Sequence, residues 1–149
     1  MPKVISNTSC LIVLDNIDML GILKELYGSI IITKEVSEEF CRTIPDWIDV
    51  REVNDQKYLE LLKNFVDLGE ASTIALSVEI DNSITILDDL KARKLAKKLN
   101  IKMTGTLGVI INAKKRNKIS CTKEVLTKIK DAGFRVSKEL ENEILKYDI

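Results

Sequence analysis

Polar and acidic side chains follow the apolar runs of this sequence that have the composition of buried β-strands. Asn7 follows the first run along the chain, and Asp88 and Asp89 follow a later one. Thr106 comes shortly after the last run. Amide, carboxylate and hydroxyl oxygens are the ligands that hard divalent cations prefer. If the fold brings these strand ends together, the set predicts a magnesium or manganese site.

Glutamates on neighbouring helical segments are candidates to complete that site. Glu38 or Glu39 can project from one helix, with Glu35 the less favoured choice, and Glu70 lies in the first turn of another. Thr8 and Ser9 add hydroxyl groups beside the first strand. Carboxylates that share a cleft repel one another unless a cation occupies it, so such a cluster favours a metal site.

Each of these residues also has a purely structural interpretation. Ser, Asn and Thr after a strand are typical N-caps that bind free helix amides. An acidic pair before a helix, or a glutamate in its first turn, complements the helix dipole. Taken singly, the structural role is the more common one. Taken together, at consistent strand ends, the residues favour a site, although their spacing alone does not name the chemistry.

The sequence contains no histidine, and this absence excludes several mechanisms. Ser-His-Asp and Cys-His hydrolases, histidine-ligated zinc sites and imidazole acid–base chemistry all require that side chain. If the chain is an enzyme, carboxylates, lysines, hydroxyl groups or a carboxylate-bound metal must carry the reaction.

The formal net charge of zero conceals a strong asymmetry. Residues 1–90 contain seven basic and seventeen acidic side chains, whereas residues 91–130 contain thirteen basic side chains and one acidic. Such a basic segment either is solvated surface or attracts a polyanion, and phosphate backbones bind lysine-rich faces in a salt-dependent way. It has little aromatic content, so base stacking is not supported there. The candidate phosphate-binding residues are Lys91, Arg93, Lys94, Lys97, Lys98, Lys114, Lys115 and Arg116.

Short apolar runs alternate with helical periodicity, which predicts an α/β fold: a three-layer α/β/α sandwich with a central parallel sheet of four or five strands. For the expected helix Lys91–Leu99, the residues predicted to face inward are Leu90 just before it and Ala92, Leu95, Ala96 and Leu99 within it. The expected strands are Lys3–Ser6, Ser29–Thr33, Trp47–Val53 (an edge strand), Ser83–Leu87 and Ile101–Thr104. Two short helices are expected within 11–26, and further helices at Lys34–Arg42, Gly69–Glu79 and Lys91–Leu99. Two more are expected to begin at an N-cap and end at a stated residue: one capped by Asp55 that ends at Val66, and one capped by Thr106 that ends at Arg116. The last two are a helix from Ser120 or Thr122 to about Ala132 and a helix capped by Ser137.

The length of 149 residues predicts one domain over 1–149, in which residues from about 120 to 149 form a helical extension. No apolar run approaches the roughly 20 residues of a membrane span. The start of the chain has no signal-peptide profile, and three cysteines lack metal-ligand spacing. We therefore expect a cytoplasmic protein with reduced thiols and no membrane partner.

Several short motifs, in order and with suitable spacing, resemble those of PIN-domain proteins. They extend from about Val4 to Ile119 and comprise Val4-Ile5-Ser6-Asn7-Thr8-Ser9, Leu20-Gly21-Ile22-Leu23, Leu68-Gly69-Glu70-Ala71, Ile86-Leu87-Asp88-Asp89 with Arg93 and Ala96, Gly105-Thr106-Leu107-Gly108-Val109 and Ala113-Lys114. The closest branch is the DUF3368 group of PIN-like proteins, which is similar to VapC-type toxin ribonucleases.

The resemblance implies a magnesium- or manganese-dependent endoribonuclease that forms homodimers, acts on RNA and is often the toxin of a toxin–antitoxin pair with an antitoxin protein. Carried over by position, the candidate catalytic residues are Asn7, Glu38 or Glu39, Glu70, and Asp88 or Asp89. The implied metal ligands among them are Asn7, Glu70, Asp88 and Asp89, with Thr8, Ser9 and Thr106 in support. The lysine-rich residues above would then bind RNA.

One position departs from the family pattern. PIN nucleases usually have Asp at the end of the first strand, and this chain has Asn7. An amide oxygen can still coordinate a hard cation, but it brings no charge. Two hypotheses therefore stay open: an endoribonuclease with weakened metal binding, or a catalytically silent module that binds RNA or a protein. A phosphate-binding α/β regulator using Asp88 and Asp89 ranks last.

Overall fold

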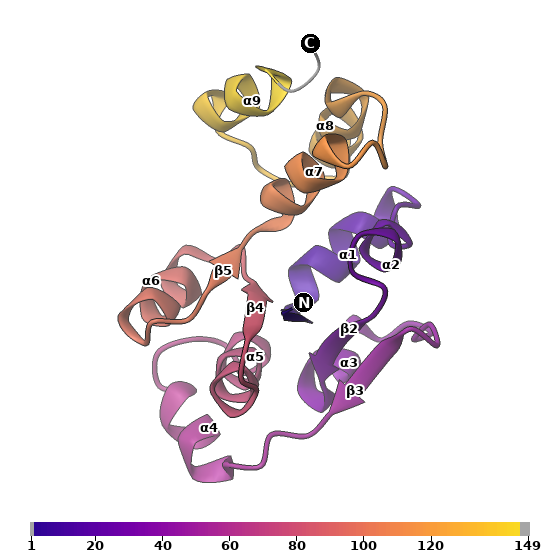
Figure 1. Ribbon diagram of the computed structural model, residues 1–149. Coiled ribbons are helices and arrows are strands. Elements are labelled where there is room, and N and C mark those ends of the chain that lie inside the picture. The colour runs from indigo at the N-terminus through magenta and orange to yellow at the C-terminus, as the bar shows by residue number, and fades with distance from the viewer. Residues whose placement is uncertain (1, 147–149) are drawn as a thin grey trace.

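The computed structural model describes residues 2–146 of the chain and contains a five-stranded sheet (Figure 1). All the strand pairs are parallel, and the strand order is β3-β2-β1-β4-β5. The strands are β1 (Lys3–Ser6), β2 (Ile30–Thr33), β3 (Ile48–Arg51), β4 (Ser83–Ile86) and β5 (Met103–Thr104). This confirms the predicted parallel sheet, with the predicted edge strand β3 at one margin.

Helices connect the strands and cover both faces of the sheet (Figure 1). Their bounds are α1 (Thr8–Asn16), α2 (Ile22–Tyr27), α3 (Lys34–Phe40), α4 (Gln56–Leu62), α5 (Leu68–Glu79), α6 (Leu90–Lys98), α7 (Thr106–Lys115), α8 (Thr122–Asp131) and α9 (Lys138–Leu145).

Two apolar clusters, one on each side of the sheet, form the core. Val4 and Ile86 point into the first cluster, which contains buried residues of α1, α2, α3 and α7. Ile5 and Leu87, their neighbours along the chain, point into the second cluster with α4, α5 and α6. Successive strand residues alternate between faces, so helices cover both faces and the three-layer α/β/α prediction is confirmed.

The C-terminal helices extend this arrangement on one side. Ile110 of α7 packs with Val125 and Ile129 of α8, and α9 contacts α8. Figure 1 shows α8 and α9 beyond α7, on the far side of that helix from β4 and β5. Among residues 2–146, no helix has the length and apolar character to cross a membrane.

The strand register brings the predicted strand ends to one edge of the sheet. Ser6 pairs with Ile86, and Ile86 pairs with Thr104. The amide of Asn7 continues the ladder by donating to the carbonyl of Ile86 at 3.1 Å. The residues that follow β1, β4 and β5 therefore lie side by side at the carboxyl edge, where sites in parallel sheets are usually found.

Some local predictions are wrong. The helix expected to reach Val66 ends at Leu62, because the chain turns at Lys63–Phe65 instead. Thr106 is the first residue of α7 rather than its cap, since its hydroxyl is used elsewhere and Gly105 holds the N-cap position. Leu90 does not face inward: it is 65% exposed, because it stands at the first position of α6, at the margin of the core.

Candidate active site

Asn7 is buried at the carboxyl end of β1, where it caps the helix that follows. Only 2% of the residue is exposed, and its Oδ1 accepts a hydrogen bond of 3.1 Å from the amide of Cys10. This is the N-cap role in which Asn and Asp are equally effective. The structural interpretation of Asn7 is therefore correct, but the residue also lines a polar cavity.

That cavity has a volume of about 220 Å³ and collects most of the predicted site residues. It contains amide, hydroxyl and carboxylate groups from the ends of β1, α3 and α5. Its lining residues are Asn7, Thr8, Ser9, Ile12, Glu39, Asp67 and Glu70. The structure thus brings together Asn7, Glu70 and the two hydroxyl residues that the sequence singled out.

The structure also distinguishes between the neighbouring glutamates of α3. Glu39 lines the cavity, and its Oε2 accepts a hydrogen bond of 3.3 Å from the Thr8 hydroxyl. Its carboxylate lies against the α-carbon of Gly69, where a β-carbon would overlap Oε1. Glu38 and Glu35 lie outside the cavity lining, and this distinguishes Glu38 from Glu39, since both of these residues are exposed. The close packing explains the glycine in the Leu68-Gly69-Glu70-Ala71 motif.

Burial, and to a smaller extent neighbouring negative charge, raises the pKa of two carboxylates of this cavity, Glu39 and Glu70. Burial, and after it the negative charge of Asp67, raises the pKa of Glu39, although hydrogen bonds from Thr8 and the Gly69 backbone oppose this. Burial likewise raises the pKa of Glu70, with further contributions from Asp67, Asp89 and Glu39. A cation in the cavity would reverse both effects, because an opposite charge favours the ionised form.

The donor set fits a hard divalent cation in kind, because it consists of carboxylate, amide and hydroxyl oxygens. Within the described residues, no three acidic or cysteine side chains lie close enough together to enclose a metal ion directly. Magnesium commonly binds one or two carboxylates and keeps several waters. A site of that kind needs only one or two of the carboxylates that line the cavity, which are Glu39, Asp67 and Glu70.

Asp88, a predicted metal ligand, does not line the cavity around Asn7. Its Oδ1 accepts a hydrogen bond of 2.7 Å from the amide of Thr106, and its Oδ2 accepts one from the Thr106 hydroxyl. Asp88 lines a separate cavity between β5, α7 and α9 and not the one around Asn7. Its visible role is to tie the start of α7 to the end of β4.

Asp88 also lies beside a thiol that the fold keeps unreactive. Cys10 is fully buried, and this burial, with the charge of Asp88, raises the pKa of its thiol to about 12. Thiolates are the reactive form of cysteine, so Cys10 acts as a small apolar core residue.

Asp89, which the sequence suggested as a site residue, caps a helix, whereas Asp67, which it did not suggest, lines the cavity. Asp89 caps α6, since its Oδ2 accepts a hydrogen bond of 3.0 Å from the amide of Ala92. Asp67 was not singled out, yet it lines the cavity and its side chain makes no capping hydrogen bond. An N-cap residue two positions before Gly69 is ordinarily assigned to helix capping, which is why sequence reasoning missed it.

The basic residues divide into two groups on opposite faces of the sheet. Lys91, Lys94, Lys97 and Lys98 are exposed on α6, which packs on the face of Ile5 and Leu87. Lys114, Lys115 and Arg116 lie at the end of α7, which packs on the face of Val4 and Ile86. The structure therefore does not join residues 91–118 into one continuous positive surface.

Three of these cations also have structural partners. Arg93 donates to the carbonyl of Leu87 at 2.7 Å, and Arg116 donates to the carbonyl of Leu26 at 3.1 Å. Lys114 donates to the carbonyl of Ser120. Of the four exposed lysines of α6, Lys91 lies closest to the carboxyl edge, because α6 begins there directly after Asp89.

Comparison with known families agrees with the fold. The model of family DUF3368, described as a PIN domain, matches residues 3–147. A search among curated proteins gives no match. Because the family model covers nearly the whole chain, the protein belongs to the DUF3368 family of PIN domains.

Proposed function

We propose that this protein is a divalent-metal-dependent endoribonuclease that hydrolyses phosphodiester bonds of RNA at the cavity beside Asn7. PIN domains are generally nucleases that use a divalent metal and bind RNA. The observation that carries the proposal is the cavity itself, because it gathers Asn7, Glu39, Asp67 and Glu70 at the carboxyl edge of the sheet.

Each side chain has a distinct part in this proposal. A bound magnesium or manganese ion would supply a Lewis acid that lowers the pKa of water and offsets charge on the phosphate. Glu39 is held by the Thr8 hydroxyl and by the Gly69 backbone, and its part is to orient the attacking water and accept the proton of that water. Glu70 and Asp67 provide negative charge to hold the cation, with Asn7 Oδ1 as a neutral ligand. Asp88 acts indirectly by fixing the start of α7 through Thr106.

We further propose that the protein functions as the toxin of a toxin–antitoxin pair, as a homodimer in the cytoplasm, with an antitoxin protein as its partner. PIN domains often have antitoxin partners, which supports this biological setting. A neighbouring gene for a short DNA-binding antitoxin, and neutralisation of RNA cleavage by its product, would test this part directly.

RNA cleavage with added magnesium or manganese tests the enzymatic assignment. We expect cleavage by the wild type, its loss on chelation, and a loss of at least ~100-fold in Glu70→Gln, as is common when a charged active-site group is removed. Glu38→Gln is the matched control, because Glu38 is exposed on the helix that carries Glu39. Cleavage that survives both chelation and Glu70→Gln would contradict the proposal.

The paired variant Asp88→Asn with Asp89→Asn tests the second acidic position. Asn caps helices as well as Asp, so the cap that Asp89 provides to α6 should survive. If these carboxylates take part in metal binding, the pair should lose metal-dependent activity while remaining folded. If they act only as caps, activity should fall little.

The second candidate function is a catalytically silent PIN module that binds RNA or a protein. The observation that favours it is the occupation of site oxygens by structural bonds: Asn7 caps α1, and Thr106 occupies both oxygens of Asp88. This candidate predicts salt-dependent RNA binding or a stable protein complex with no cleavage at any manganese concentration.

A further inference from the structure

A second, larger cavity adjoins the carboxylate cavity. It has a volume of about 600 Å³ and is lined by residues 63–67, between α4 and α5, and 89–91, at the start of α6. Asp67 lines both cavities, and the charge of Asp89 reaches Glu70. A polymer bound at the carboxylate cavity would therefore pass directly into this second space.

Two large apolar side chains are exposed in this cavity. Phe65, in the turn after α4, is 59% exposed, and Leu90, at the start of α6, is 65% exposed. Single exposed apolar residues are common on protein surfaces. Here an aromatic ring and a leucine share one hollow whose other walls are largely polar, which is an arrangement suited to a flat ring system with polar edges.

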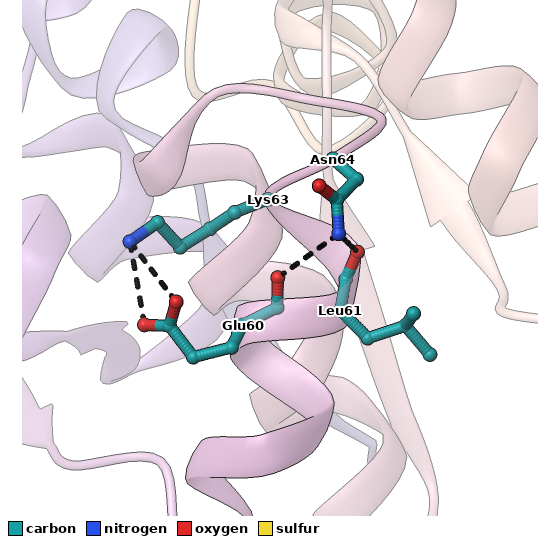
Figure 2. A network of polar contacts seen from close by, with 4 residues as sticks. All are labelled: Glu60, Leu61, Lys63 and Asn64. Atoms are coloured by element: carbon teal, nitrogen blue, oxygen red, sulfur yellow. Dashed lines mark hydrogen bonds and ion pairs between the residues drawn. The ribbon is translucent and has the colours of Figure 1, made fainter.

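The turn that carries Phe65 is held in place by local polar contacts (Figure 2). The side-chain amide of Asn64 donates to the carbonyl of Leu61 at 3.1 Å and to that of Glu60 at 3.5 Å. Lys63 pairs with Glu60 at 3.3 Å. The amide of Phe65 also donates to the carbonyl of Leu62 at 2.9 Å. These contacts fix the backbone beneath Phe65, so the turn itself loses little conformational freedom when a ligand binds.

Positive charge continues from the cavity along α6. Lys91 lines the cavity, and Lys94, Lys97 and Lys98 follow on the exposed part of the same helix. Within residues 2–146, none of these four lysines forms a salt bridge. Lysines without a carboxylate partner are available to phosphate groups, and each such contact makes binding more salt-dependent.

We propose that Phe65 and Lys91 form a nucleotide subsite, in which an unpaired base of single-stranded RNA stacks on the phenyl ring while Lys91 contacts a phosphate. This inference rests on the proposed function, because it gives the RNA a path beside the cleavage site. Aromatic side chains stack on bases of every type, and bases are accessible for stacking in single strands rather than in duplexes. The subsite therefore selects for strandedness rather than for sequence.

The lining favours RNA over a protein partner. Five of the eight lining residues are polar or charged: Lys63, Asn64, Asp67, Asp89 and Lys91. The core of a protein interface is depleted in charged residues. A base offers polar edges to these groups and a flat face to Phe65, whereas an apolar side chain from a protein would leave them without partners.

Fluorescence anisotropy with a labelled single-stranded RNA tests the subsite. An RNA of about twelve nucleotides is long enough to span one such binding site. Chelator is present, so that binding is measured without cleavage. Phe65→Ala should weaken binding about tenfold, which corresponds to ~1.4 kcal/mol and is typical of one stacked base. Phe65→Trp should bind as the wild type does, and its added indole fluorescence should be quenched by RNA. The matched control is Leu61→Ala, because Leu61 is 55% exposed on α4 and does not line the cavity.

Lys91→Ala tests the phosphate contact. We expect weaker binding and a decrease of about one in the slope of log affinity against log salt concentration. Lys57→Ala is the control, because it removes the same charge from an exposed position of α4 outside the cavity. Equal salt slopes for the two variants would overturn the phosphate contact.

The outcomes separate this inference from the proposed function. If the wild type cleaves RNA with manganese but Phe65→Ala binds RNA as tightly as the wild type, the subsite is overturned and the nuclease proposal stands. If the wild type binds RNA through Phe65 but does not cleave it, the subsite stands without the nuclease. If Phe65→Ala changes the oligomeric state in light scattering but not RNA affinity, the surface is a protein interface and the subsite is overturned.

Discussion

The carboxylate of Glu39 rests on the α-carbon of Gly69, so that one residue of α3 and one of α5 fit together only because position 69 has no side chain. Gly69 is also the residue whose backbone hydrogen bond holds the Glu39 carboxylate. This contact fixes a candidate catalytic group of α3 against α5. The role of Gly69 in the site is to leave space for the Glu39 carboxylate, and this role does not depend on backbone flexibility.

Gly69→Ala should therefore separate activity from stability. Alanine in place of glycine near the start of a helix adds about 0.5–1 kcal/mol of helix stability, while the end of the Glu39 side chain can move away at little cost. We expect a melting temperature within a few degrees of the wild type and RNA cleavage lowered about tenfold or more. Gly21→Ala is the control, because a β-carbon there meets no atom within 4 Å. Unchanged cleavage by Gly69→Ala would contradict the role of the contact.

Asn7→Asp should restore the usual acidic residue without losing the helix cap, since Asp and Asn cap equally well. Without metal, a carboxylate that is almost fully buried near Glu39 and Glu70 should lower the free energy of unfolding by ~1–3 kcal/mol. Added manganese should reverse that loss and raise the melting temperature of the variant more than that of the wild type. RNA cleavage should rise about tenfold or more.

The control for this substitution is Asn7→Ala, which loses the cap at a cost of about 1 kcal/mol and gains no ligand. Its melting temperature should respond to manganese less than that of Asn7→Asp. If manganese stabilises neither the wild type nor Asn7→Asp, the cavity is not a metal site, and equal stabilisation of the two would mean that residue 7 is not a ligand. If the variant binds manganese but does not cleave RNA, the silent-module hypothesis gains support.

The pKa shifts predict how stability changes with pH in metal-free protein. The folded-state pKa of Glu70 lies above its usual value of 4.5, chiefly because the carboxyl is partly buried. The ionised form is then penalised in the folded state, and the penalty disappears as the pH falls through the folded pKa towards 4.5. Glu70→Gln should be more stable than the wild type at neutral pH, and the difference should shrink as the pH falls.

Urea unfolding from mildly acidic to mildly alkaline pH, with chelator present, measures that difference. Gln retains a side-chain oxygen for the hydrogen bond that Glu70 accepts from its own backbone amide. Glu38→Gln provides the comparison, because its side chain is exposed on α3. A Glu70→Gln variant less stable than the wild type at neutral pH would show that its charge is already compensated in the folded protein.

The fold was predictable because its strands are short, apolar and separated by helical periodicity. Ile30–Thr33 is fully buried, as its β-branched composition indicates for a central parallel strand. Strand ends at one edge then follow from the parallel arrangement, and the start of α5 brings Glu70 into the same cavity as Asn7. Helix bounds were less predictable, because the turn after Leu62 depends on the side chain of Asn64.

Side-chain direction was the part that the sequence could not specify. Glu38 and Glu39 are adjacent on a helix and point about 100° apart, so a shift of one residue decides which enters the site. Asp88 and Asp89 are likewise adjacent, and the structure directs them to the starts of different helices. The basic segment divides because α6 and α7 lie on opposite faces of the sheet, which follows from strand order and not from charge pattern.

Thr106→Val should show what the Asp88 contact contributes. Thr106 is fully buried, and its hydroxyl is one of two donors to the Asp88 carboxylate. Valine has the same shape but leaves Oδ2 without that donor, which should cost ~1–3 kcal/mol in urea unfolding. Thr106→Ser retains the hydroxyl and should lose only the methyl contribution, ~0.8 kcal/mol.

A double-mutant cycle with Asp88→Asn isolates the pair. In the Asp88→Asn background the valine substitution should cost less, because a neutral amide left without its donor is penalised less than a carboxylate. Equal costs in both backgrounds would mean that the threonine acts through packing alone. RNA cleavage by Thr106→Val should be measured well below the melting temperature of the variant. Any decrease should then arise from a shift of α7, and not from the loss of a direct contact between residue 106 and the substrate.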